Sequence, residues 1–131
     1  HLLFGHTSDI LYMLGAIKET NVGTCLDTGH ANLSGELFNV VHKMSGHLRM
    51  IHANDNKGDW DAHLVPGKGT IDWTRIVHDL TNANFRGTVI LELAGGEGLS
   101  PAGMLERARH GRQFLQDICR REAVPVSPQE T

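Results

Sequence analysis

The chain contains 131 residues, with 12 Lys and Arg against 15 Asp and Glu, and its formal net charge is −3. This composition is typical of one globular domain and gives no basic surface of the kind that binds nucleic acid non-specifically. No apolar run reaches the roughly 20 residues that a membrane-spanning helix needs. The two cysteines, Cys25 and Cys119, are too few and too far apart for a disulfide framework. We therefore expect a cytoplasmic protein without a membrane partner.

The predicted elements alternate between helix and strand along the chain. Ser8 can cap a first helix whose apolar positions follow the 3.6-residue period, and residues 22–26 then form a buried strand that ends at Asp27. After a loop rich in Gly, His and Asn, Ser34 can cap a second helix. A second strand covers residues 48–51 and leads into a long loop of Asn, Asp, Gly and Pro.

The second half of the chain repeats this alternation. Asp72 caps a third helix with one apolar stripe, and residues 88–93 form a β-branched strand. A Ser-Pro pair then opens a fourth helix, which ends near Cys119. The Pro-rich residues 122–131 lack a helical pattern, and we expect them to be a disordered tail.

Strands that alternate with helices predict an α/β fold with a parallel sheet and right-handed crossovers. Three strands and four helices are too few for a complete (β/α)8 barrel, which takes eight strands and about 250 residues. The chain is therefore either part of a barrel or a small three-stranded α/β unit. It opens at His1 in what reads as mid-domain sequence, so we expect part of a (β/α)8 TIM barrel.

Each predicted strand ends in a side chain that can bind a divalent metal. Asp27 follows the first strand, His52 follows the second, and Glu92 lies inside the third. Because the carboxyl ends of parallel strands share one edge of the sheet, these three side chains should converge within metal-bridging reach. A carboxylate in an ion pair at a strand end explains any one of them, but it explains the set of three poorly.

Further candidate residues lie in the loops that follow the strands. His30 comes just after Asp27, and it is either a second imidazole of the site or an incidental member of a turn. Asp61 and His63 would lie on the same side of an extended segment, which suits a chelating pair and equally suits a loop fastened by its own hydrogen bonds. Lys68 lies in a Pro-Gly-Lys-Gly turn that is too short for a phosphate-binding P-loop, although it could reach an anionic substrate.

Three motifs in order, CLDTGHAN, IHANDNKGDWDAHLVPGKGTIDW and VILEL, resemble the xylose isomerase-like TIM-barrel superfamily. The resemblance runs from about Thr7 to Cys119. This superfamily holds sugar and sugar phosphate isomerases and epimerases together with endonuclease IV-type apurinic endonucleases. The resemblance assigns residues 1–121 to the C-terminal part of the barrel and leaves residues 122–131 as the tail.

In the sugar-isomerase branch, the resemblance implies one Mn, Mg or Co ion held by Glu, Asp, His and Glu from four successive strands. Asp27, His52 and Glu92 match the last three ligands, and the first Glu would lie on a strand before the first residue. Glu92 would also exchange the substrate proton through a metal-stabilised enediolate. His30 would act on the substrate, and Asn54 and Lys68 complete the set of residues expected to contact it.

The endonuclease branch implies a different metal content and a different partner. There, the resemblance implies an enzyme that binds several zinc ions and cleaves abasic DNA. His30, Asp61 and His63 match ligands of a zinc ion that the isomerase branch does not bind. The text HLVPGKGTIDW is more similar to the isomerase branch. An inactive fragment of the same fold is a third hypothesis. In every case we expect the rest of a barrel, or a homo-oligomer, to cover the faces that this chain leaves open.

Overall fold

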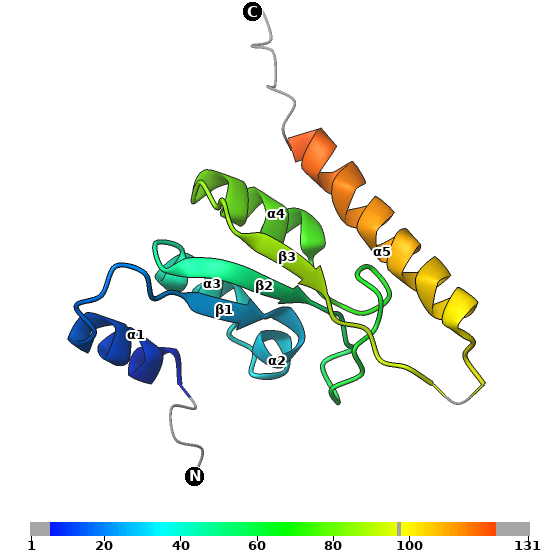
Figure 1. Cartoon of the computed structure of the whole chain (residues 1–131), viewed down its shortest axis with the longest axis horizontal. Helices are drawn as coiled ribbons and strands as arrows, with labels where there is room; N and C mark the ends of the chain where they lie inside the picture. Colours follow the sequence, from blue (N-terminus) through cyan, green and yellow to red (C-terminus); the bar gives the residue numbers. More distant parts are fainter. Residues whose placement is uncertain (1–5, 97, 123–131) are drawn as a thin grey trace, which may run out of the picture.

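A computed structural model of the chain describes residues 6–96 and 98–122. Within them, helices and strands alternate along the chain (Figure 1). The elements are α1 (Thr7–Ala16), β1 (Thr24–Asp27), α2 (Thr28–Leu33), α3 (Leu37–Met44), β2 (Leu48–Ala53), α4 (Trp73–Asn82), β3 (Thr88–Leu91) and α5 (Pro101–Glu122).

The three strands form one parallel sheet in the order β1-β2-β3. Asp27 pairs with His52, and His52 pairs with Ile90 on its other side. The side chains of these residues therefore lie on one face of the sheet, and Glu92, two residues beyond Ile90, follows them. The expected α/β class with about three parallel strands is confirmed.

The main difference from the expected elements is α2, because its segment was predicted to be a loop. Asp27 is the N-cap of this helix, and its Oδ1 accepts a hydrogen bond of 3.0 Å from the His30 backbone N–H. Six residues are too few to show helical periodicity, so only the cap could have indicated it. At the other end of the chain, α5 extends beyond Cys119 to Glu122. The remaining predicted tail, residues 123–131, lies outside the described residues.

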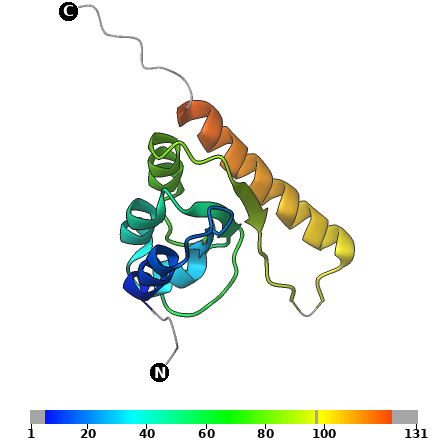
Figure 2. The ribbon, with the colours of Figure 1, turned by 60° about the vertical axis from the view of Figure 1, so that its left-hand side comes forward.

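The hydrophobic core lies between one face of the sheet and the helices. Leu26, Ile51 and Ala53 of the sheet pack in one cluster with Val41 of α3 and Ile76 of α4. Figure 2 shows α4, α3 and α1 stacked along one flank of the sheet, while α5 packs against α4 and β3. Within the described residues, no helix is long and apolar enough to cross a membrane.

The opposite face of the sheet is much less covered. Ile90 is 41% exposed there, and Cys25 is also exposed. This open face carries Asp27 and His52 at its carboxyl-terminal edge. The helices thus support the sheet from one side and leave these side chains accessible from the other.

Candidate metal centre

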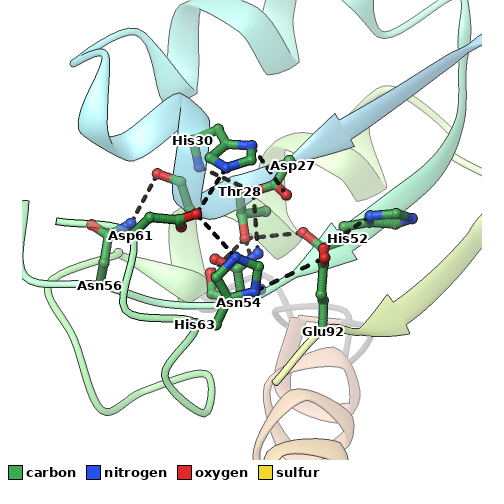
Figure 3. Close-up of polar contacts among 10 residues, drawn as sticks. Asp27, Thr28, His30, His52, Asn54, Asn56, Asp61, His63 and Glu92 are labelled. Atoms are coloured by element: carbon green, nitrogen blue, oxygen red, sulfur yellow. Dashed lines mark hydrogen bonds and ion pairs between the residues drawn. The ribbon is translucent and has the colours of Figure 1, made fainter. Parts of the chain in front are cut away.

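Asp27, His52 and Glu92 converge at the carboxyl-terminal edge of the sheet (Figure 3). Each offers one ligand atom, and these atoms lie within 4.8 Å of one another. His52 Nδ1 is 3.0 Å from Glu92 Oε2. Two carboxylates and one imidazole at such separations can provide three ligands of a divalent cation.

The Asp27 carboxylate is held in place by its surroundings. Besides the His30 backbone N–H, the Asn54 side-chain amide donates to Asp27 Oδ1 over 3.1 Å. Asn54 is itself fixed by Thr28, whose hydroxyl donates to the Asn54 carbonyl over 2.7 Å and accepts from its N–H over 3.1 Å. Oδ1 is thus engaged from two sides, which fixes the orientation of the whole carboxylate.

Glu92 provides the observation that tests whether a cation fits here. Its Oε2 atom is buried and has no hydrogen-bond partner among the described residues. His52 Nδ1 lies 3.0 Å from it and forms an ion pair with it only when that imidazole is protonated. A buried carboxylate oxygen is costly to leave unsatisfied. A divalent cation between Asp27, His52 and Glu92 would satisfy it, so the donor set fits such an ion.

A second group of side chains lies beside the first. The Asp61 Oδ2 atom is 3.0 Å from His30 Nε2 and 3.1 Å from His63 Nε2. The two imidazole rings meet edge to face, with centroids 6.2 Å apart. One carboxylate oxygen therefore joins two histidines from different parts of the chain, and one ligand atom from each of these three residues lies within 4.8 Å of the others.

The Asp61–His63 contact does not come from an extended segment, which was the geometry considered from the sequence. His63 has a φ of 42°, in the left-handed region that a residue with a Cβ adopts at a cost. Such backbone conformations cluster at functional sites.

The electrostatics of the second group favour a charged pair. Burial alone would raise the pKa of Asp61, but hydrogen bonds from His30 and His63 and the charges of these imidazoles outweigh it and lower that pKa. Burial would likewise lower the pKa of His63, yet the hydrogen bond and charge of Asp61, together with the charge of Glu92, raise it. An ionised carboxylate thus lies beside an imidazole that readily takes a proton.

The two groups are linked at both ends. His30 Nδ1 lies 3.4 Å from Asp27 Oδ2, and His63 Nδ1 lies 4.0 Å from Glu92 Oε1. Three acids and three imidazoles therefore form one continuous polar cluster, with His30 and His63 at the junctions.

Of the two other predicted substrate residues, one supports a carboxylate of the cluster and the other shows no polar contact with it within the described residues. Asn54 is fully buried, so in this structure its amide faces Asp27 instead of the open mouth, and it positions that carboxylate. Lys68 is exposed in the turn that packs over α5, where a Cβ on Gly67 would press on Phe114. The described residues show no hydrogen bond or ion pair between the Lys68 side chain and the cluster.

Sequence reasoning missed Asp55, which organises the loop between β2 and α4. It is completely buried, and its carboxylate accepts four hydrogen bonds. The donors are the backbone N–H groups of Asn56, Gly67 and Ile71 and the indole of Trp73. The available signal was an Asp two residues beyond the end of β2 in a Gly-rich loop, which is equally typical of an exposed turn.

The chain belongs to the xylose isomerase-like TIM barrel family, whose model matches residues 1–118. An uncharacterized protein of Methanocaldococcus jannaschii is 30% identical over 86 residues, covering 63% of this chain and 29% of that protein. A probable endonuclease 4 of Mycobacterium leprae is 35% identical over 80 residues, covering 55% of this chain and 32% of that protein. The fold is thus that of a partial barrel.

Solved structures give the same fold. A D-psicose 3-epimerase from Clostridium cellulolyticum, described with D-tagatose, superposes with a TM-score of 0.78 at 19% identity, over 91% of this chain and 45% of that chain. A xylose isomerase domain protein from Alicyclobacillus acidocaldarius gives a TM-score of 0.72 at 25% identity, over 91% and 44%. The chain therefore spans less than half the length of these structures, and less than a third of the curated relatives above.

Proposed function

We propose that this chain is the C-terminal part of a divalent-metal-dependent sugar or sugar phosphate isomerase or epimerase. The observation that carries the proposal is the convergence of Asp27, His52 and Glu92 within 4.8 Å at the strand ends. The family and its epimerase structures support this reading of the site. A fourth ligand, a glutamate, would come from a strand that precedes this chain in the full-length protein.

The chemistry of the donors suits a hard cation. Two carboxylates and one imidazole favour Mn, Mg or Co over a soft metal. When bound, such a cation supplies the positive charge that stabilises an enediolate, the anion formed when a ketose loses the proton next to its carbonyl group.

The side chains of this chain then have distinct tasks. The Glu92 side chain is 41% exposed although its Oε2 atom is buried, so its carboxylate can reach the substrate and take the proton from the carbon beside the carbonyl. The Asp27 carboxylate, which Asn54 orients, would be a ligand of the cation. His30, whose side chain is 62% exposed, can hydrogen-bond a substrate hydroxyl while Asp61 fixes its ring.

The alternative is a zinc phosphodiesterase that acts on abasic DNA. It is favoured by the second group, in which two imidazoles and one carboxylate are the ligands that zinc prefers, and by the relatives called probable endonuclease 4. In this alternative, His30, Asp61 and His63 bind a metal ion and do not serve only to line the entrance to the metal centre.

The proposal is tested with the full-length protein, stripped with a chelator and reloaded with Mn2+ or Zn2+. Each form is assayed on a ketose panel that includes D-tagatose and on an abasic DNA duplex. We expect ketose epimerisation or isomerisation that is lost on stripping and restored by one equivalent of Mn2+. Cleavage of the abasic strand that needs two or more zinc ions, with no ketose conversion, would contradict the proposal.

A further inference from the structure

The two tryptophans of the chain have opposite environments. Trp73 is 3% exposed, and its indole N–H donates to Asp55 Oδ2 over 2.9 Å. Trp60 is 66% exposed. A large aromatic side chain in water leaves apolar surface uncovered, and Trp is enriched where proteins meet their ligands and partners because its ring is amphipathic.

Trp60 lies on a short segment that is anchored at both ends. Residues 57–61 are all exposed, but Asn56 before them is completely buried and Ala62 after them is 6% exposed. The loop after β2, which contains this segment, projects beyond the arrowheads of the strands (Figure 1). The segment that carries the exposed indole is therefore fixed at both ends and belongs to the loop at the carboxyl-terminal edge of the sheet (Figure 1).

The residue next to Trp60 ties this segment to the candidate site. Asp61 contacts His30 at 3.0 Å and His63 at 3.1 Å, and both imidazoles neighbour the carboxylates of the first group. The main chain at Trp60 is thus held within one residue of the polar cluster. Its backbone N–H also donates to Asp59 Oδ1 over 2.9 Å.

The charges of the segment indicate which kind of ligand an indole here would meet. Lys57 is the one cation of residues 57–61, against the two acids Asp59 and Asp61. A phosphodiester backbone would be repelled by this balance, since nucleic-acid binding depends on cationic side chains. An uncharged polyol is not repelled, and the C–H groups of a sugar suit the electron-rich face of an indole.

We propose that Trp60 is a substrate-contacting residue whose indole packs against the C–H face of a ketose bound at the metal centre. It would determine affinity for the sugar without taking part in proton transfer. This inference rests on the proposed function, and it adds a contact that the ligand set does not provide. Pockets for small ligands commonly combine one such aromatic surface with a few polar groups.

The test uses the Mn2+-loaded full-length protein and its Trp60→Ala and Trp60→Phe variants, with Asp59→Asn as the control. Asp59→Asn keeps the oxygen that accepts from the Trp60 N–H and changes only the exposed charge. We expect Trp60→Ala to raise KM for the ketose by about 2- to 12-fold with kcat nearly unchanged. Trp60→Phe should recover most of the affinity, and the control should match the wild type.

Acrylamide quenching of fluorescence supplies a readout that does not depend on turnover. The difference between the wild type and Trp60→Phe isolates the signal of Trp60. Saturating D-tagatose should reduce the quenching of Trp60 and leave that of the buried Trp73 unchanged. Normal KM in Trp60→Ala, or unchanged quenching with D-tagatose bound, would overturn the inference. So would protection by abasic DNA in place of D-tagatose, or shielding that depends only on protein concentration.

Failure of this inference can be told apart from failure of the proposed function. Ketose turnover with a normal KM in Trp60→Ala would reject the role of Trp60 and leave the proposed isomerase function in place. Protection of Trp60 by D-tagatose in a protein that converts no ketose would reject the proposed isomerase activity and leave the Trp60 contact in place. A protein that neither binds nor converts a ketose overturns both.

Discussion

At the residue scale, the two linked groups assign different importance to two carboxylates. Glu92 has a buried oxygen without a hydrogen-bond partner among the described residues, whereas Asp61 is already engaged by two imidazoles. The proposed function makes Glu92 a ligand and a base, and it makes Asp61 a residue that positions others. The zinc alternative makes Asp61 a ligand. Substitution of Glu92 and substitution of Asp61 therefore separate the isomerase hypothesis from the zinc-nuclease hypothesis.

For the full-length protein, the proposed function predicts that Glu92→Gln lowers ketose turnover by about 10²-fold or more, because the amide cannot accept the substrate proton. One oxygen ligand remains, so the affinity for Mn2+ should fall only modestly. Steady-state kinetics and isothermal titration with Mn2+ measure the two effects. Turnover like that of the wild type would remove Glu92 from the mechanism.

Asp61→Asn is the counterpart, and it should affect turnover far less than Glu92→Gln. Its amide oxygen can take the place of Oδ2, the one oxygen that both imidazoles contact, and the metal content of the protein should stay at one ion. Elemental analysis of the purified variant measures that content. Loss of a tightly bound zinc together with loss of activity would show that Asp61 is a ligand, as the nuclease alternative requires.

Gly29 supports the site through its lack of a side chain. A Cβ there would overlap the Asn54 amide oxygen, and the same amide orients Asp27. Gly29→Ala should lower the free energy of unfolding by about 1–3 kcal/mol, the usual cost of overpacking, and weaken Mn2+ binding. Gly46→Ala is the matched control, since a Cβ at that position meets no atom within 4 Å. Equal behaviour of the two variants in denaturant unfolding and Mn2+ titration would refute this role.

At the element scale, the loop between β2 and α4 is the part that positions the second group. It is held by the Asp55 carboxylate and by two backbone hydrogen bonds between Asp55 and Leu64, of 2.9 and 2.8 Å. These contacts fix the loop on both sides of residues 57–61. The loop is therefore built around a buried acid.

Asp55→Asn should destabilise the protein by roughly 3 kcal/mol, because an amide nitrogen would face two of the four N–H donors and leave them unsatisfied. Urea unfolding measures the change. Asp59→Asn, an exposed acid in the same loop, should change stability by less than about 0.5 kcal/mol. If the two variants are equally stable, Asp55 does not organise the loop.

The sequence predicts the elements that local patterns determine. The apolar stripe after Asp72 and its cap indicated α4, and the Asp72 side chain accepts from the Arg75 N–H over 3.0 Å. The positions of Asp27, His52 and Glu92 followed from the common direction of parallel strands. By contrast, the helix α2 and the burial of Asp55 depend on tertiary contacts with Asn54 and Trp73, which no local pattern contains.

At the scale of the whole molecule, the chain leaves one face of the sheet and two strand edges without a partner among the described residues. β1 and β3 pair only with β2, and the open face carries the exposed Ile90. Exposed strand edges and apolar surface promote association. A closed barrel would cover both, and the family provides that architecture.

We therefore expect the 131-residue chain, produced alone, to self-associate, and a longer chain with the preceding strands to be a cooperatively folded unit. Sedimentation velocity over a range of concentrations, together with urea unfolding, compares the two forms. A 131-residue chain that stays monomeric at high concentration and unfolds cooperatively would contradict the partial-barrel account.

The central claim is that Asp27, His52 and Glu92 bind one divalent cation. Anomalous diffraction from crystals of the full-length protein soaked in Mn2+ tests it most directly. The account predicts one strong anomalous peak about 2.0–2.2 Å from a ligand atom of each residue. A peak confined to His30, Asp61 and His63, or none near Glu92, would contradict it.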